Sequence, residues 1–344
     1  MSASVLLLAD PGAPAALAAD LSTELPERLP HHPPLEWTVS VQTASYRLTE
    51  QSSLSEVLES VDPPSRQQDV VVYVTDLPRR DGTQPVVADI SIPDRFGVIS
   101  VPSVGGLFIS RRVRTMVESV VIEVAENRDG HVATFGNLTR TEDQGAVRYA
   151  ASPRFARFRM FMGMIYANRP WKLAAGLSRV LMATFATGTV SLAYPTIWQL
   201  SSTMGPWRLG VTTVLATAAM VGWLIVNHRL WERPSSPIER ELAVMYNAST
   251  VATLTIGVVV LHAACFVLLL LTAWWTLPPS LLEQNLGHPV GASDLLRLAW
   301  LSAAIATLGG ALGSGLEDDE AVKQAAYGAR QHERFDRFKR PADG

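Results

Sequence analysis

The pattern of apolar and polar residues divides this chain into two unlike parts. Before residue 153, short apolar runs alternate with polar stretches, as they do in soluble domains built from strands and helices. After Trp171, apolar residues gather in long blocks without a charge at their centre. The chain is therefore expected to hold a soluble α/β domain at 1–152 and an all-α, four-helix transmembrane domain at 173–316.

Within the first part, the order of apolar runs predicts the fold class. Short apolar runs are expected to form strands at 5–9, 37–42, 69–75 and 97–101. Apolar residues at helical spacing predict an amphipathic helix at 110–126, and the segments 13–29 and 53–61 also suit helices, with charged residues on their outer faces. The run 70–74 is apolar throughout, which is typical of a central strand buried on both faces. Strands alternating with helices indicate a layered α/β domain with some parallel pairing.

Four blocks in the second part are long enough to cross a membrane. A helix needs about 20 mostly apolar residues to span the hydrocarbon core. The blocks lie at 177–199, 207–227, 251–275 and 295–316. Pro195, near the end of the first block, should kink that helix or end its regular part. The chain is thus predicted to be an integral, multi-pass membrane protein.

The positions of Lys and Arg predict the orientation of these spans. Basic residues concentrate before the first block, between the second and third blocks, and after the fourth. Loops rich in Lys and Arg stay on the cytoplasmic side, and the N-terminus shows no signal peptide. We therefore expect a protein of the plasma (cytoplasmic, inner) membrane with both termini in the cytoplasm and a polar cytoplasmic tail at 317–344.

Small residues at intervals of four predict close contacts between helices. The fourth block carries Gly309-x-x-x-Gly313, and the first carries Thr184-x-x-x-Gly188. Such ridges let helix backbones approach closely in lipid, although glycine is also simply common in membrane helices. The interface could lie within one chain or between chains. The expected partner is therefore a second copy of this chain, giving a homo-oligomer, or another membrane protein.

One ionisable side chain lies near the middle of a predicted span. His262 in the third block is a candidate functional residue, because ionisable groups at membrane depth commonly serve function. Alternatively, it is a neutral imidazole bonded to a carbonyl or hydroxyl group of a neighbouring helix. No Asp, Glu or Lys lies in the middle of any block, which argues against proton-coupled or cation-coupled transport.

The segment 153–172 joins the two parts and mixes Arg with Phe, Met and Tyr. It is predicted to be an amphipathic helix in the inner membrane interface, or else a packed linker helix. In the first case Arg154, Arg157 and Arg159 would contact anionic headgroups, which makes membrane lipids an expected partner. The small net charge of −3 argues against nucleic acid as a partner.

The loop after the predicted central strand is the candidate ligand site. Its charged residues are Asp76, Arg79, Arg80 and Asp81. Ligands of α/β proteins gather at the carboxyl ends of the strands, so these side chains could bind a polar ligand. Alternatively, Asp76 caps the turn and the arginines are solvated or face lipid headgroups. The sequence holds no catalytic motif, phosphate loop or metal-ligand cluster, so no cofactor, metal or catalytic residue is assigned.

Two stretches of the sequence carry a resemblance to known proteins. The first holds VVYVTDLPRRDGTQPVVADIS and GVISVPSVGG, followed by Arg111-Arg112-Val113-Arg114, and the second is ELAVMYNASTVATLTIGV at 241–258. Together they resemble a family of actinobacterial multi-pass membrane proteins whose activity is uncharacterised. The first stretch is also similar to zincin metalloproteases, whose next helix carries HExxH. Here that helix has Glu118 and Glu123 but no His, which implies a zinc-free relative.

Three functions are compatible with these features. The favoured interpretation is a non-enzymatic membrane scaffold, or a regulatory or assembly protein, whose cytoplasmic domain binds a partner or its own copies. A second is an oligomeric channel or transporter. The third is a membrane-anchored enzyme that acts at the 76–81 loop through Asp76, Asp81 and Asp89, with or without a metal. The sequence leans away from an enzyme because it shows no catalytic constellation.

Overall fold

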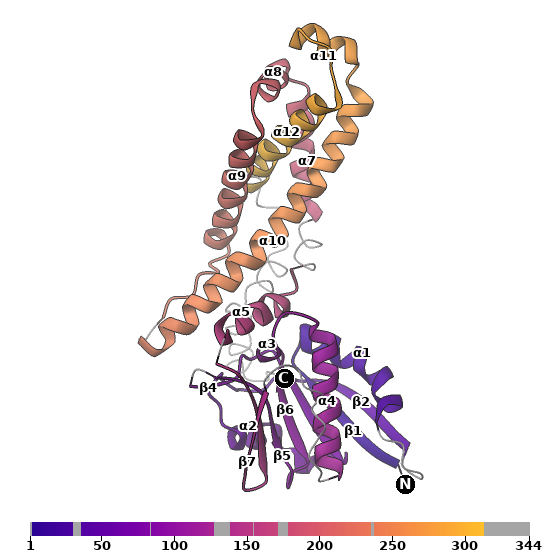
Figure 1. The fold of residues 1–344 in the computed structure, drawn as a ribbon, viewed down its shortest axis with the longest axis vertical. Helices are drawn as coiled ribbons and strands as arrows, with labels where there is room; N and C mark the ends of the chain where they lie inside the picture. The colour runs from indigo at the N-terminus through magenta and orange to yellow at the C-terminus, as the bar shows by residue number, and fades with distance from the viewer. Residues whose placement is uncertain are drawn as a thin grey trace, which may run out of the picture. The chain divides into compact units, whose positions relative to one another are not determined.

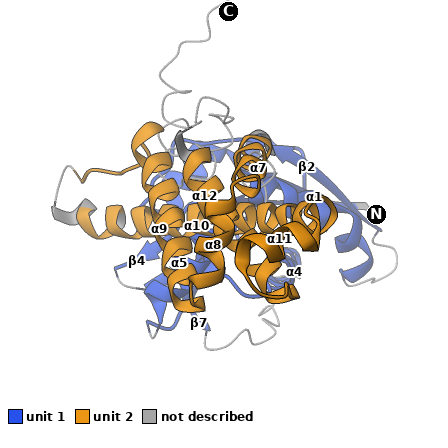
Figure 2. Cartoon of the chain, turned by 90° about the horizontal axis from the view of Figure 1, so that it is seen from above, with its two compact units in different colours: residues 1–168, 331–344 blue, residues 169–330 orange. Residues whose placement is uncertain are grey.

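The computed structural model describes residues 2–29, 36–82, 84–126, 138–153, 155–170, 178–234 and 237–312. The chain separates into two compact units, residues 1–168 with 331–344 and residues 169–330 (Figure 2). The first is an α/β unit and the second is a helical unit. The predicted division into an N-terminal α/β domain and a helical C-terminal region is therefore confirmed at this level.

The α/β unit is built on one mixed sheet with the strand order β2-β1-β3-β6-β5-β8-β7, to which β4 adds by pairing with β5. The strands are β1 (Ser2–Ala9), β2 (Glu36–Thr43), β3 (Val70–Thr75), β4 (Arg80–Asp81), β5 (Gln84–Ser91), β6 (Phe96–Ser100), β7 (Leu138–Asp143) and β8 (Ala146–Ala151). Strands β2, β1, β3 and β6 are parallel, as expected for the predicted strands. The antiparallel part, made by β5, β8 and β7, was not predicted.

Helices cover both faces of this sheet (Figure 1). They are α1 (Ala13–Arg28), α2 (Leu54–Val61), the 3₁₀ turn η1 (Pro63–Ser65), α3 (Val101–Val104), α4 (Ile109–Glu126) and α5 (Ala156–Ala167). Because side chains alternate along a strand, β1 feeds two cores. Leu7 packs with Leu21 of α1 and Val117 of α4. Leu8 faces the other way and packs with Val57 of α2.

Close packing of α4 on the sheet depends on a glycine. A Cβ atom at Gly97 of β6 would collide with the side chain of Val120 on α4. The absence of a side chain at residue 97 thus allows the helix to approach the parallel strands. This contact places the amino end of α4 and the short helix α3 beside the carboxyl ends of β3 and β6.

The helical unit contains α7 (Ser178–Leu192), α8 (Pro195–Thr203), α9 (Pro206–Asn227), α10 (Pro237–Thr276), α11 (Pro279–Leu286) and α12 (Ala292–Leu312). Within the described part of the chain, two helices are long and apolar enough to cross a membrane, namely α9 and the stretch Ala243–Thr276 of α10. The bent pair formed by α7 and α8 would make a third if it is one broken span. These helices do not by themselves confirm the predicted total of four spans.

The first predicted span, 177–199, is broken near Pro195 into two helices. Helix α7 ends at Leu192, α8 begins at Pro195, and the two axes differ by 89°. Proline has no N–H to donate, and its ring clashes with the preceding turn, so the helix cannot continue through Pro195. The indole Nε1 of Trp198 donates to the Leu192 carbonyl at 2.8 Å, which satisfies one acceptor at the end of α7. The predicted effect of Pro195 is therefore confirmed.

Helix α10 is longer than the predicted span 251–275. It has 40 residues, which at 1.5 Å per residue is about 60 Å, roughly twice the thickness of a hydrocarbon core. Glu239, Arg240 and Glu241 are among its first five residues, so the beginning of the helix is polar in sequence. The apolar part that could cross a membrane is only the portion from Ala243 onward.

Candidate functional site

The predicted ligand loop lies at the carboxyl end of the parallel part of the sheet. Strand β3 pairs in parallel with β1 on one side and with β6 on the other. The loop that follows Thr75 is therefore flanked by the residues that follow Ala9 of β1 and Ser100 of β6. This is the place where α/β sheets commonly bind ligands.

The carboxylate of Asp10, directly after β1, lies at the centre of this end of the sheet. Its side chain is only 1% exposed. Oδ1 accepts a hydrogen bond from the Tyr73 hydroxyl at 2.7 Å, and Oδ2 accepts one from the Thr75 hydroxyl at 2.6 Å. Oδ2 also accepts from the backbone N–H of Asp76 at 3.2 Å. Asp10 therefore fastens the end of β1 to the end of β3, a role that the sequence analysis did not assign.

Asp76 and Arg79 are both buried rather than turned toward solvent. The guanidinium Nη2 of Arg79 donates to Oδ2 of Asp89 on β5 at 2.8 Å. The main chain of the same residue is held by two serines. Its N–H donates to the hydroxyl of Ser100 at 3.2 Å, and its carbonyl accepts from the hydroxyl of Ser103 at 2.9 Å. The interpretation of Arg79 as a solvated arginine is therefore wrong.

Arg80 and Asp81 form the two-residue strand β4, with Arg80 half-buried and Asp81 exposed. Asp81 accepts from Nη1 of Arg148 at 2.6 Å, and Nε of Arg148 donates to Oδ1 of Asp89 at 2.7 Å. Burial alone would lower the pKa of Arg148, but the hydrogen bond and charge of Asp89, together with Asp81, raise it above its ordinary value. Successive ion pairs thus link Arg79, Asp89, Arg148 and Asp81. We call this set the Arg79–Asp89–Arg148–Asp81 chain.

The Arg79–Asp89–Arg148–Asp81 chain leaves few charged groups of the loop available to a substrate. Both oxygens of Asp89 accept from arginines, and the loop itself is closed by the Ser100 hydroxyl, which donates to the Leu77 carbonyl at 2.5 Å. Of the three aspartates considered for an enzyme, Asp89 is held between two cations and Asp81 is held by one. Among the residues that the structure describes, no group of three or more His, Cys, Asp or Glu side chains could hold a metal ion.

Two glutamates of the helix likened to that of zincins, Glu118 and Glu123, form ion pairs. Glu123 on α4 is buried, and its Oε1 accepts from Nε and Nη2 of Arg140 at 3.0 and 2.7 Å. Its Oε2 accepts from the Tyr149 hydroxyl at 2.7 Å. Glu118 pairs with Arg28 of α1 at 3.2 Å. These contacts tie α4 to β7, β8 and α1. The histidines nearest to this helix in the sequence, His31, His32 and His131, lie outside the described residues.

His262 in the helical unit contacts a hydroxyl group of another helix. Its Nδ1 lies 3.1 Å from Oγ1 of Thr307 on α12. The Thr307 hydroxyl donates to the carbonyl of Ala303 at 2.8 Å, so its oxygen is available to accept from a protonated Nδ1. His262 therefore has the contact with a hydroxyl group of a neighbouring helix that the second alternative for this residue includes.

The small-residue ridges of α7 and α12 face each other. A Cβ atom at Gly309 would lie 2.8 Å from Cγ2 of Thr187, and one at Gly310 would collide with the hydroxyl of Thr184. A Cβ atom at Gly188 would lie 2.5 Å from Cδ1 of Leu269 on α10. The contact between the first and fourth blocks is thus made within one chain. Gly313 lies outside the described residues.

The junction helix α5 packs on the α/β unit. It buries Met160, Met164 and Ala167, and its Gly163 lies against the carbonyl of Pro102. Nε of Arg159 donates to the Ser103 carbonyl at 2.8 Å. Burial, followed by the charge of Arg112, lowers the pKa of Arg159 to about 10. Of the other two predicted headgroup ligands, Arg157 is exposed and Arg154 lies outside the described residues.

Comparison with protein-family models, with curated proteins and with solved structures gives no match to this chain. Its function therefore has to be argued from its own residues.

Proposed function

We propose that this chain is a multi-pass membrane scaffold or assembly protein that acts through contacts rather than through catalysis. In this proposal the helical unit anchors the chain in the plasma membrane, and the α/β unit lies in the cytoplasm and binds a partner or further copies of the chain. The observation that supports the proposal best is that the carboxylate of Asp89 is already bonded to two arginines. Its two oxygens accept from Arg79 and Arg148 at the place where an α/β fold would bind a ligand.

The energetics of this ion-pair chain favour a structural role. Removing one partner of a buried ion pair costs about 3–5 kcal/mol, because the other charge remains buried without compensation. A ligand that recruited Asp89 or Arg79 would have to break such a pair. The carboxylate of Asp10 likewise accepts hydrogen bonds from three donors on β3 and the loop that follows it. This end of the sheet therefore supports the architecture of the unit better than it supports a reaction.

The surface of the helical unit supports the membrane part of the proposal. Large apolar side chains are exposed along α9 and α10, including Val214, Leu215, Val260 and Leu271. Contiguous apolar surface of this kind is rare on soluble proteins and suits contact with lipid. Trp207, Trp231, Trp274 and Trp275 are also exposed and lie at or near helix ends. Tryptophan is enriched at the two interfaces of a bilayer.

We further propose four crossings with both termini inside. Helices α9 and α10 supply two, and the broken pair of α7 and α8 supplies a third. Helix α12 has 21 residues, or about 32 Å, which matches a hydrocarbon core of about 30 Å. The basic loops named from the sequence then face the cytoplasm.

Native mass spectrometry tests the scaffold proposal. The full chain would be extracted with its lipids into native discs from its own membrane and analysed without further detergent. We expect a complex of fixed stoichiometry, containing either several copies or one copy with a second protein. A single chain without a protein partner would contradict the proposal. A single chain that turns over a metabolite or conducts ions in liposomes would instead favour the enzyme or channel alternatives.

A further inference from the structure

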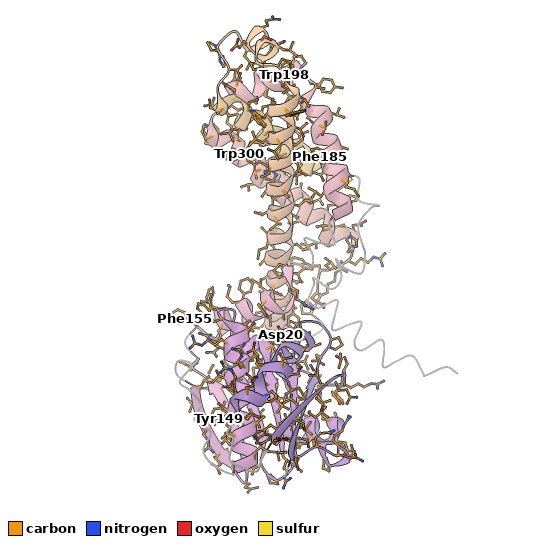
Figure 3. All side chains as sticks on the ribbon, turned by 90° about the vertical axis from the view of Figure 1, so that its right-hand side faces the viewer. Asp20, Tyr149, Phe155, Phe185, Trp198 and Trp300 are labelled. Carbon is orange, nitrogen blue, oxygen red and sulfur yellow. The ribbon has the colours of Figure 1, made fainter. Side chains whose placement is uncertain are left out.

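Four large apolar side chains of the α/β unit are strongly exposed. Their exposed fractions are 63% for Leu107, 78% for Phe108, 81% for Phe155 and 60% for Phe158. In the described part of this unit, the other large apolar side chain classed as exposed is Val41, at 37%. Figure 3 shows Phe155 at the surface of the unit and Tyr149 inside it. The exposure is therefore concentrated in two short segments.

These two segments lie side by side. The first is the turn between α3 and α4, and the second is the beginning of α5. A Cβ atom at Gly106 would lie 2.5 Å from Cβ of Met162, and one at Gly105 would lie 2.9 Å from Cγ of Arg159. Leu107 and Phe108 follow these glycines directly. Together with Phe155, Phe158 and the exposed Arg111 and Arg157, they form what we call the Phe–Arg surface.

The backbone of this surface is held in an unfavourable conformation. Phe108 has φ of 53° and Phe155 has φ of 59°. Bulky residues rarely adopt positive φ, because Cβ then approaches the carbonyl group. Folding the α/β unit gains little burial from these two residues, since both are largely exposed. Such strain is commonly retained where the exposed residue has a function.

The two segments that carry these rings are basic, and Arg114 in the first of them pairs with Glu24 of α1 at 2.6 Å. Residues 101–117 and 153–172 contain no Asp or Glu. Nη1 of Arg112 donates to the Val104 carbonyl at 3.3 Å, and Arg159 donates to the Ser103 carbonyl, so these two hydrogen bonds do not neutralise either charge. The neighbouring charge of Arg112 also contributes to the lowered pKa of Arg159. An anion near these arginines would relieve this repulsion.

A short connection joins α5 to the first helix of the helical unit. Helix α5 ends at Ala167 and α7 begins at Ser178. The intervening residues, 168–177, can span at most roughly 35 Å when fully extended. Helix α5 is also fixed to the α/β unit through Met160, Met164 and Gly163. The connection therefore sets only an upper limit on the distance between the end of α5 and the beginning of α7.

We infer that the Phe–Arg surface docks the α/β unit on the anionic headgroup layer of the membrane that holds the helical unit. Phe108, Phe155 and Phe158 would insert among the headgroups, where aromatic rings are favoured. Arg111 and Arg157 would lie against the lipid phosphates, where basic side chains are attracted. This inference rests on the proposed membrane anchoring, and it adds a fixed contact that orients the cytoplasmic unit.

Lipid-dependent quenching in the full chain tests this docking. In a Cys265→Ala background, Ser110→Cys places a bimane label beside Phe108, and Ser60→Cys places the same label on α2 as a matched control. Both serines are exposed. Each labelled chain is reconstituted in discs of phosphatidylcholine, with or without phosphatidylglycerol, containing doxyl-labelled lipid. We expect at least roughly twofold stronger quenching at residue 110 than at residue 60 in anionic discs, and a decrease in high salt.

Two further results separate docking from anchoring. The combined change Phe108→Ser, Phe158→Ser, Arg111→Gln and Arg157→Gln should abolish the excess quenching at residue 110 while the chain remains in the disc. Equal quenching at residues 110 and 60 in anionic discs would overturn the docking and leave the anchoring intact. Excess quenching that persists in the combined variant would likewise overturn the Phe–Arg surface as its cause. Release of the chain from discs by alkaline extraction would instead overturn the anchoring itself.

Discussion

Arg79 and Asp89 form a buried ion pair, with 2.8 Å between Nη2 and Oδ2. The pair joins the loop after β3 to strand β5, which lies on the other side of β6 in the sheet. Arg148 donates to the other oxygen of the same carboxylate, so one aspartate organises two arginines. The part of the α/β unit that most resembles a ligand site is therefore also one of its most tightly connected parts.

Asp89→Asn should destabilise the protein strongly. The change leaves the guanidinium of Arg79 buried without its counter-charge, so we expect a loss of about 3 kcal/mol in the free energy of unfolding. Denaturant unfolding of the full chain, followed by circular dichroism, measures this loss. Glu142→Gln is the matched control, because Glu142 is half-exposed in its pair with Arg140, and we expect less than about 1 kcal/mol there. Equal effects of the two variants would contradict a structural role for Asp89.

Stability should fall at alkaline pH through Tyr149. Burial, followed by the hydrogen bond to Glu123, raises the pKa of Tyr149 above its ordinary value of 10.0. The unfolded chain would release this proton near pH 10.0, whereas the folded chain would retain it. The contribution is therefore complete below that pH and decreases as the pH rises toward the folded pKa.

Melting curves of the wild type and Tyr149→Phe between about pH 8 and about pH 11 test this linkage. The variant should be less stable at the lower pH, because Oε2 of Glu123 loses the hydroxyl donor. It should also lose less stability than the wild type as the pH rises above the ordinary tyrosine pKa. Parallel curves for the two proteins would show that Tyr149 does not cause the alkaline decrease.

Gly309→Ala should weaken the contact between α7 and α12. The added Cβ would lie 2.8 Å from Cγ2 of Thr187, so the two helices must move apart or Thr187 must shift. Overpacking of this kind costs about 1–3 kcal/mol. Thermal unfolding in lipid discs measures the effect. Gly222→Ala on α9 is the matched control, because its Cβ would meet nothing within 4 Å. An unchanged melting temperature for Gly309→Ala would contradict the close contact.

Sequence patterns predicted the parallel part of the sheet well, because β1, β3 and β6 are apolar runs followed by helices or loops. They did not predict β5, β8 and β7. Strand β5 carries Asp89 and β8 carries Arg148, so a partly buried ion pair interrupts the apolar pattern that marks a buried strand. These two residues are 59 positions apart, and local spacing cannot reveal such a pairing.

The candidate loop follows the central strand, as the sequence indicated, but the sequence did not reveal the partners of its charged side chains. A charged loop after a central strand predicts a polar site, and it cannot show that Arg79 turns inward to Asp89. Asp10 was missed because a lone Asp after a strand has no distinctive spacing. In the helical unit, Pro195 indicated the break between α7 and α8, whereas apolar content alone suggested one continuous span.

Cysteine accessibility in intact cells tests the central claim most directly, namely that the chain crosses the membrane and keeps its α/β unit in the cytoplasm. Thr203 and Gln284 are exposed and lie in the two connections expected outside, while Ser60 is exposed on the α/β unit. In a Cys265→Ala background, Thr203→Cys and Gln284→Cys should react with an impermeant thiol reagent, and Ser60→Cys should react only after the cells are opened. Labelling of Ser60→Cys in intact cells, with protection of the other two, would contradict the account.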